Sequence, residues 1–136
     1  MEPATVGSSV MFVAHLDRSV DFYRDVFGCQ VTLREEGAAL MLAPGGFQLY
    51  LIEKGDRAQH PAGGIGVQYL MWATDSTAGL ARLEQALDAR GSPTHTHASG
   101  GVRFVVGRDP DGIRVVIAHP SPEQRPRSVL DVLLYV

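Results

Sequence analysis

Apolar positions along the chain follow two periods in turn, which predicts strands and helices in a fixed order. Residues 8–15 (SSVMFVAH) form a short apolar run typical of a strand. The next apolar residues recur at helical spacing: Val20, Tyr23, Val26 and Phe27. Asp17 or Ser19 can cap the start of this helix, and Gly28 ends it, because glycine adopts the left-handed conformation cheaply. Three shorter strands are expected next, at 29–36, 38–44 and 47–53.

The second half of the chain repeats this order after a polar linker at 55–65. A strand at 67–75 precedes a helix that Asp75 or Ser76 can cap. The apolar positions of that helix are Leu80, Leu83, Ala86 and Leu87. Three strands follow at 93–99, 101–107 and 112–119, with a hairpin turn over 109–112. Matching His15 with Asp75 gives a repeat offset of 60, which indicates a duplicated unit.

The repeat predicts a single α+β domain, residues 1–136, built from two βαβββ modules at 6–54 and 66–120. Each helix must cover one face of its strands, so the sheets can curve around a concave cup with their other faces. Alternation along the strands assigns Met11 and Val13 to the helix side. It assigns these candidate ligand-binding residues to the cup: Ser8, Phe12, Gln48, Tyr50, Gln68, Leu70, Trp72, Arg114 and Val116. A shift of one residue would invert any of these assignments.

Composition and charge exclude several functional classes. The net charge is -3, with 12 basic against 15 acidic residues, which argues against nucleic-acid binding. No apolar run reaches the length of a membrane span, and no signal peptide is evident, so we expect a cytoplasmic protein. Cys29 is the single cysteine, so no internal disulfide can form, and we interpret it as a small buried hydrophobe.

The proposed cup lining is mainly apolar and aromatic with a few polar groups, which is typical of a small-molecule site. Trp72 offers a flat stacking surface, and Arg114 can pair with a carboxylate, sulfate or phosphate, or stack on a planar ligand. The alternative is that Trp72 and Tyr50 fill the core and that Arg114 is an exposed strand residue. Asp109 and Asp111 are interpreted as surface or turn residues.

The stretches "HLDRSVDFYRDVFG" and "RDPDGIRVVIA", on the doubled unit, resemble the vicinal oxygen chelate superfamily. It includes glyoxalase I, bleomycin-resistance proteins, fosfomycin-resistance enzymes and extradiol dioxygenases, and the resemblance covers about residues 6–120. The resemblance implies that metal-dependent members would place ligands at Ser8 and Gln68 on the first strands, and at Gln48 and Val116 on the last strands. None of these is a His, Asp, Glu or Cys, so we expect no metal and no cofactor.

The resemblance favours a metal-independent binding protein like the bleomycin-resistance branch, whose ligand is an antibiotic or an aromatic natural product. It also implies a homodimer. The first alternative is an enzyme: an isomerase, cyclase or lyase with Tyr50, His95 or His97 as the acid or base, or a metal-dependent activity with non-standard ligands such as His95 and His97. The second is an interaction domain whose cup is filled by its own side chains.

The chain ends in an unusually apolar segment. The tail, residues 121–136, closes with "VLDVLLYV", which is too apolar to favour contact with water. We expect it to pack on the domain or on a partner subunit.

Overall fold

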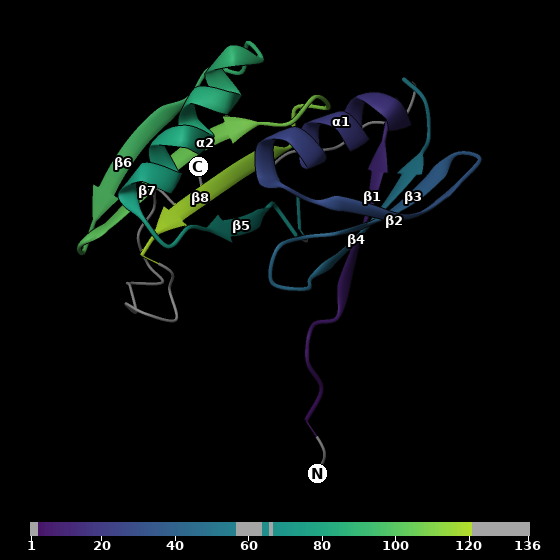
Figure 1. The fold of residues 1–136 in the computed structure, drawn as a ribbon, viewed down its shortest axis with the longest axis horizontal. Helices are drawn as coiled ribbons and strands as arrows, with labels where there is room; N and C mark the ends of the chain where they lie inside the picture. Colours follow the sequence, from purple (N-terminus) through teal and green to yellow (C-terminus); the bar gives the residue numbers. More distant parts are fainter. Residues whose placement is uncertain (1–2, 57–63, 66, 121–136) are drawn as a thin grey trace. The chain divides into compact units, whose positions relative to one another are not determined.

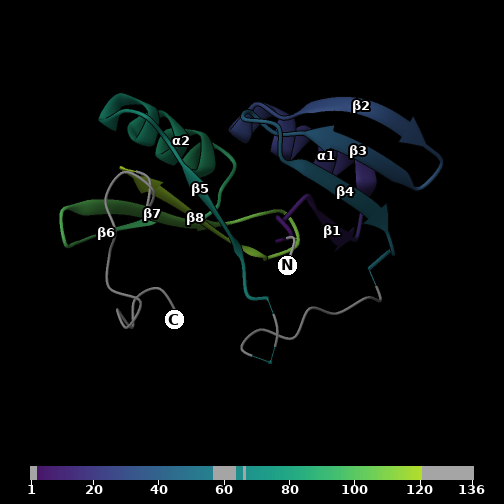
Figure 2. The same cartoon turned by 90° about the horizontal axis from the view of Figure 1, so that it is seen from below.

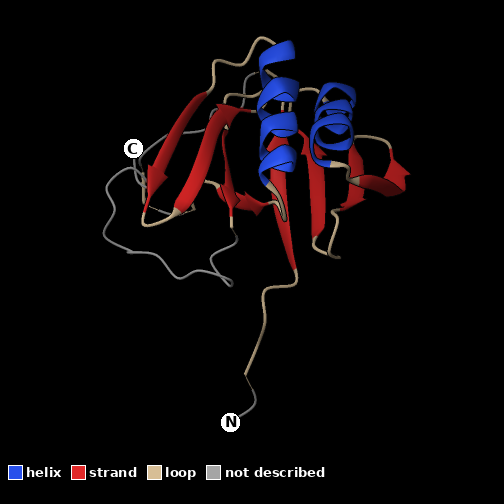
Figure 3. Cartoon of the chain, turned by 60° about the vertical axis from the view of Figure 1, so that its left-hand side comes forward, coloured by secondary structure: helices blue, strands red, loops and turns tan. Residues whose placement is uncertain are grey.

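Two four-stranded sheets, each covered by one helix, confirm the α+β class and the two βαβββ modules (Figures 1 and 3). The computed structural model describes residues 3–56, 64–65 and 67–120. The first module comprises β1 (Ser8–Val13), α1 (Leu16–Phe27), β2 (Gln30–Glu35), β3 (Ala38–Leu42) and β4 (Gln48–Glu53). The second comprises β5 (Leu70–Ala73), α2 (Thr77–Ala89), β6 (His95–Ser99), β7 (Val102–Arg108) and β8 (Arg114–His119). The tail and most of the linker lie outside the described residues.

The chain forms two compact units that differ from the two modules in one respect. The segment Asp109–Ile113, which joins β7 to β8, belongs to the first unit, while the strands on either side of it belong to the second. No helix in the described part of the chain is long and apolar enough to cross a membrane.

The first sheet has the strand order β1-β4-β3-β2, with β1 parallel to β4 and the remaining pairs antiparallel. Helix α1 packs on one face of this sheet. The side chains that meet between them are almost fully buried: Val13, Val20, Phe22, Val26, Met41, Leu49 and Leu51. Since alternate residues of a strand point to opposite faces, the remaining positions of β1 and β4 leave the other face of the sheet uncovered by α1.

Helix α1 ends as the sequence predicts but begins differently. Gly28 has φ 74°, and its N–H donates to carbonyl groups of the last turn. The helix begins at Leu16, with His15 as the N-cap residue, so neither Asp17 nor Ser19 is the cap. The Glu53 carboxylate, at the end of β4, accepts the Leu16 N–H at 2.8 Å instead. A side chain from a distant strand therefore accepts the backbone N–H at the start of the helix, in place of a local N-cap side chain.

The second sheet has the order β5-β8-β7-β6, again with one parallel pair, β5 with β8. Figure 2 shows α2 lying along one face of this sheet. Helix α2 begins after Ser76, whose side chain accepts the Gly79 N–H at 3.0 Å, so Ser76 rather than Asp75 is the cap. The N-caps His15 and Ser76 are 61 positions apart, one more than the predicted offset of 60.

Candidate functional site

The first-sheet face, which we define as the face of the first sheet opposite α1, carries four of the predicted site residues. Ser8 is the register partner of Gln48, and Val10 is the partner of Tyr50. Directly paired residues share a face, and Phe12 follows Val10 by two positions. The structure therefore brings Ser8, Phe12, Gln48 and Tyr50 onto one face, as the alternation predicts.

This first-sheet face is apolar and open to solvent. Val10 is 64% exposed and Phe12 is 59% exposed. Lys54 places its Nζ 4.6 Å from the centre of the Phe12 ring, a cation–π arrangement. Leu33 of β2, the partner of Leu40 of β3, lies on the same face and is 54% exposed. An exposed group of large apolar side chains of this kind marks a binding surface more often than an idle one.

The second-sheet face, the face of the second sheet opposite α2, carries Arg114 and Val116 as predicted. Val116 is only 3% exposed. It forms a buried cluster with Val102, Phe104 and Ala118, and Tyr69, Met71 and Val106 pack against that cluster. The second-sheet face is thus largely filled by side chains, in contrast to the first-sheet face.

Leu70 and Trp72 lie on the side of the second sheet that faces α2, so the prediction that they share a face with Val116 is wrong. Leu70 is the partner of Val115, and Trp72 of Ile117. Val115 also pairs with Gly107, where an added Cβ would lie 3.1 Å from Leu87 Cδ1 of α2. Gln68 precedes β5 in an exposed segment without strand structure.

The repeat offset explains this inversion. With the N-caps 61 positions apart, Ser8 corresponds to Tyr69 and Val10 to Met71, rather than to Gln68 and Leu70. A shift of one residue moves a whole strand's side chains to the opposite face. Tyr69 and Met71 are therefore the β5-side residues of the second-sheet face, and the sequence interpretation missed both. Assigning the N-cap to Ser76 instead of Asp75 would have given the offset of 61 and so located both residues.

Arg114 and Tyr69 are in contact on the second-sheet face. The Arg114 Cζ lies 5.6 Å from the centre of the Tyr69 ring, and both residues are partly buried. Arg114 is therefore not a fully exposed strand residue; its guanidinium is held over an aromatic ring of the same sheet.

The positions at which a metal would be held do not offer suitable donors. The first-sheet pair is Ser8 with Gln48, and the equivalent pair in the second sheet is Tyr69 with Arg114, next to Val116. A divalent ion prefers imidazole, thiolate or carboxylate ligands, and a guanidinium would repel it. These residues do not fit a metal centre.

His95 and His97 share the second-sheet face, since their partners are Val106 and Phe104. The His97 ring stacks on Phe104 with centroids 6.0 Å apart. Within residues 3–56, 64–65 and 67–120, no group of three or more His, Cys, Asp or Glu side chains is placed to hold a metal ion.

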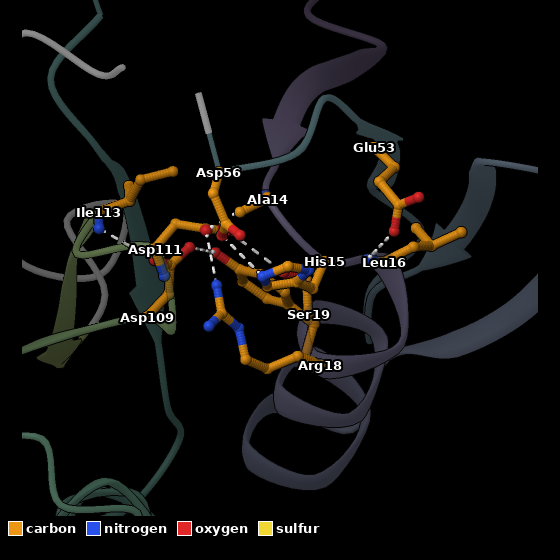
Figure 4. A network of polar contacts seen from close by, with 11 residues as sticks. Ala14, His15, Leu16, Arg18, Ser19, Glu53, Asp56, Asp109, Asp111 and Ile113 are labelled. Atoms are coloured by element: carbon orange, nitrogen blue, oxygen red, sulfur yellow. Dashed lines mark hydrogen bonds and ion pairs between the residues drawn. The ribbon is translucent and has the colours of Figure 1, made fainter. Parts of the chain in front are cut away.

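The turn before β8 is fixed by a buried hydrogen-bond network centred on Asp109 (Figure 4). Asp109 is 5% exposed and accepts the Tyr23 hydroxyl at 2.7 Å. It also accepts the backbone N–H groups of Asp111 at 2.8 Å and of Ile113 at 2.9 Å. Burial raises the pKa of Asp109, and burial beside this carboxyl raises the pKa of Tyr23 well above its ordinary value. Asp109 is a turn residue as predicted, but it is not on the surface.

Asp111 fastens the same turn to the start of α1. Its Oδ1 accepts the Ala14 N–H at 3.2 Å and Arg18 at 2.9 Å, and its Oδ2 accepts the Ser19 hydroxyl at 3.4 Å (Figure 4). The two carboxylates therefore give the segment that leads into Arg114 a fixed conformation. The bonded residues are more than 80 positions apart in the sequence, so no local pattern could predict these contacts.

Cys29 is buried, as predicted. Burial raises the pKa of the Cys29 thiol to about 11. The thiol therefore stays protonated at neutral pH and is not a nucleophile.

The comparisons with known proteins agree with this architecture. The family model for the Glyoxalase/Bleomycin resistance protein/Dioxygenase superfamily matches residues 5–117. No curated protein matches the chain.

Three solved structures illustrate the likeness. A glyoxylase/bleomycin resistance protein/dioxygenase domain from Frankia sp. EAN1pec is 21% identical, with 87% of this chain and 98% of that chain covered and a TM-score of 0.71. The lactoylglutathione lyase from Agrobacterium tumefaciens is 23% identical, with 87% and 95% covered and a TM-score of 0.66. The fosfomycin resistance protein FosX from Mesorhizobium loti is 13% identical, with 92% and 98% covered and a TM-score of 0.69. The chain therefore belongs to the glyoxalase/bleomycin resistance protein/dioxygenase superfamily, the vicinal oxygen chelate group that its motifs resemble.

Proposed function

We propose that this protein binds a small planar or aromatic molecule without a metal ion or other cofactor, and that it acts in the cytoplasm. The observation that carries the proposal is the open first-sheet face, where Val10 and Phe12 are more than half exposed beside Tyr50. Apolar contact area with a few polar groups is the usual composition of a small-molecule site. Ser8 and Gln48 supply the polar groups at one end of this face.

The class of ligand follows from the family description and from one relative's name. The family description includes bleomycin resistance proteins, and one similar structure is a fosfomycin resistance protein. An antibiotic or a related natural product is therefore the ligand we propose, with sequestration as the activity. Metal independence is supported by the donor set: Ser8, Gln48, Tyr69 and Arg114 stand where ligands would be needed.

Changing Val10 to Ser is expected to weaken ligand binding about tenfold, because the contact loses apolar area. The measurement is isothermal titration calorimetry of the purified protein with bleomycin and with a panel of planar natural products. The metal content of the same sample is measured first.

Val31→Ser is the matched control, because Val31 pairs with Met41 on the α1 side of the same sheet and is also exposed. Equal losses in both variants would place binding elsewhere than on the first-sheet face. Stoichiometric zinc, iron or manganese in the sample would overturn metal independence.

An enzyme is the second candidate, favoured by the shared face of His95, His97 and Arg114. A histidine on this face can move a proton in an isomerase, cyclase or lyase reaction, with β7 between the two histidines and Arg114 of β8. Chromatography of the titrated compounds distinguishes the two functions, because sequestration leaves the compound unchanged and catalysis does not. Neither binding nor turnover would leave the interaction-domain alternative.

We also propose that the protein is a homodimer and that its apolar tail contributes to packing. Ending the chain at Pro126 is expected to lower the dimer fraction or the solubility, because the removed residues are mostly apolar. Light scattering coupled to size-exclusion chromatography measures the mass. An unchanged mass together with an unchanged melting temperature would contradict a packing role for the tail.

A further inference from the structure

Two arginines lie opposite each other on the second-sheet face. Arg108 at the end of β7 is the register partner of Arg114 at the start of β8. Gly107 faces α2, so Arg108 points to the opposite face, the one that carries Arg114. In the next pair toward the turn, the Asp109 N–H donates to the Ile113 carbonyl at 2.8 Å, so that pair is the hydrogen-bonded type. The arginine pair is thus the closely spaced, non-hydrogen-bonded type, with Cα atoms about 4.5 Å apart in general.

Arg108 and Arg114 carry like charges, and like charges directly across an antiparallel pair destabilise a sheet unless other groups compensate them. Among the described residues, no carboxylate forms an ion pair with Arg114, in contrast to Arg18, Arg24 and Arg34. Arg114 is nevertheless partly buried, against the Tyr69 ring. A partly buried guanidinium without a carboxylate needs a counter-charge from elsewhere.

We propose that Arg114, together with Arg108 and the Tyr69 ring, binds a carboxylate, sulfonate or phosphate group on the second-sheet face. The inference rests on the proposed function, small-molecule binding, and adds a chemical class: a planar or aromatic molecule that carries such an anionic group. The guanidinium plane binds two oxygens of such a group at once. Met71, the next residue on this face of β5, is partly buried and lies beside the charge.

The Arg114 side chain is held in place before any ligand arrives, and strand pairing fixes the backbone of both arginines. The two residues flank the turn 109–113, whose conformation is fixed by hydrogen bonds to Asp109 and Asp111. Tyr69 holds the Arg114 guanidinium from one side. Less side-chain freedom is then lost on binding, which favours affinity.

A pair of fluorescent dyes that share an aromatic body separates charge from apolar contact. Anilinonaphthalene sulfonate carries a sulfonate, and N-phenylnaphthylamine is its neutral counterpart. We expect the sulfonate dye to bind the wild-type protein more tightly than the neutral dye. In Arg114→Gln its affinity is expected to fall about tenfold, with little change for the neutral dye, because hydrogen bonds to a charged group are lost.

Arg103→Gln is the matched control, since Arg103 is an exposed arginine of the same strand as Arg108 but points to the α2 side. It is expected to leave both affinities unchanged. Arg114→Lys, which keeps the charge but not the planar fork, is expected to lie between wild type and Arg114→Gln. The sulfonate affinity of the wild type should also fall more steeply with salt than that of Arg114→Gln.

The outcomes distinguish this inference from the function on which it rests. Equal binding of the two dyes, with no effect of Arg114→Gln, would overturn the anion site and leave the small-molecule proposal standing. No binding of either dye would count against the proposed function itself. Loss of binding of both dyes in Arg114→Gln and in Arg114→Lys, but not in Arg103→Gln, would show a general packing role for Arg114. That result would overturn the anion site.

Discussion

Changing Asp109 to Ala is expected to lower the free energy of unfolding by about 3 kcal/mol. The buried carboxylate accepts hydrogen bonds from the buried Tyr23 hydroxyl and from two partly buried backbone N–H groups. Each donor left without an acceptor costs about 1–3 kcal/mol, and relief of the buried charge offsets part of the sum. Urea denaturation followed by circular dichroism measures the change at neutral pH.

Tyr23→Phe isolates one of these bonds. It is expected to cost about 1–2 kcal/mol, and the double variant with Asp109→Ala should cost less than the sum of the two single changes. Asp21→Ala is the control, because Asp21 is an exposed acid on the same helix whose ion pair with Arg24 lies at the surface. A loss below about 1 kcal/mol for Asp109→Ala would show that the network contributes little.

The Asp109 carboxyl also predicts a pH dependence with a definite sign. Its pKa is raised from 3.8, mainly by burial, so the folded state holds the proton more tightly than the unfolded state. The contribution of Asp109 to the free energy of unfolding is therefore largest below its ordinary pKa. It declines as the pH rises through the raised pKa. Relative to Asp109→Asn, which cannot ionise, the wild type should lose free energy of unfolding as the pH rises from the ordinary to the raised pKa. Parallel curves of the free energy of unfolding against pH for the two proteins would contradict a raised pKa of Asp109.

Changing Leu87 to Ala is expected to destabilise the second unit by about 3 kcal/mol, the usual size for emptying a fully buried leucine site. Leu87 is 0% exposed and packs from α2 onto the sheet at Gly107. Trp72, which lies on the α2 side of the same sheet, reports unfolding by its fluorescence. Gln85→Ala is the control, because it shortens an exposed side chain of the same helix to alanine without emptying a buried site.

Gly107→Ala tests the same contact from the other side. A Cβ at Gly107 would lie 3.1 Å from Leu87 Cδ1, tighter than ordinary van der Waals contact. The single change is expected to cost about 1 kcal/mol by overpacking. In the Leu87→Ala background the added methyl group has room, so the same change should become neutral or stabilising. Additive costs in the double variant would show that the two sites do not share this space.

Most of the fold could be predicted from local sequence because its signals are local. The alternation in β1 and β4 sorted Ser8, Phe12, Gln48 and Tyr50 correctly, since polar and apolar residues mark two different faces there. Gly28 identified the end of α1 because a left-handed residue is needed at that point.

The face of β5 could not be predicted in the same way. Its sequence, LMWA, is apolar at every position, so alternation carries no information about which side faces α2. The assignment then depended on the repeat offset, and this depended on choosing between Asp75 and Ser76 as the cap. Only the register with β8 resolves the choice, because Leu70 pairs with Val115 on the α2 side.

The polar part of the candidate site was the least predictable. Arg114 was identified from its strand, but its companion Arg108 was not, because the cross-strand pairing decides which residue stands opposite. Asp109 read as an ordinary turn residue, since Asp-Pro-Asp-Gly is a common turn sequence. Its buried hydrogen-bond partner is Tyr23, which lies 86 positions earlier in the chain.

The segment Asp109–Ile113 means that the chain cannot be cut between its two modules without removing part of the first compact unit. A fragment that ends at residue 64 would contain α1 but none of the carboxylates that Tyr23, Arg18 and Ser19 bind in the first unit. We expect such a fragment to fold incompletely unless the second half is supplied with it. The compact unit is the first module together with this distant turn, not the module alone as the repeat suggests.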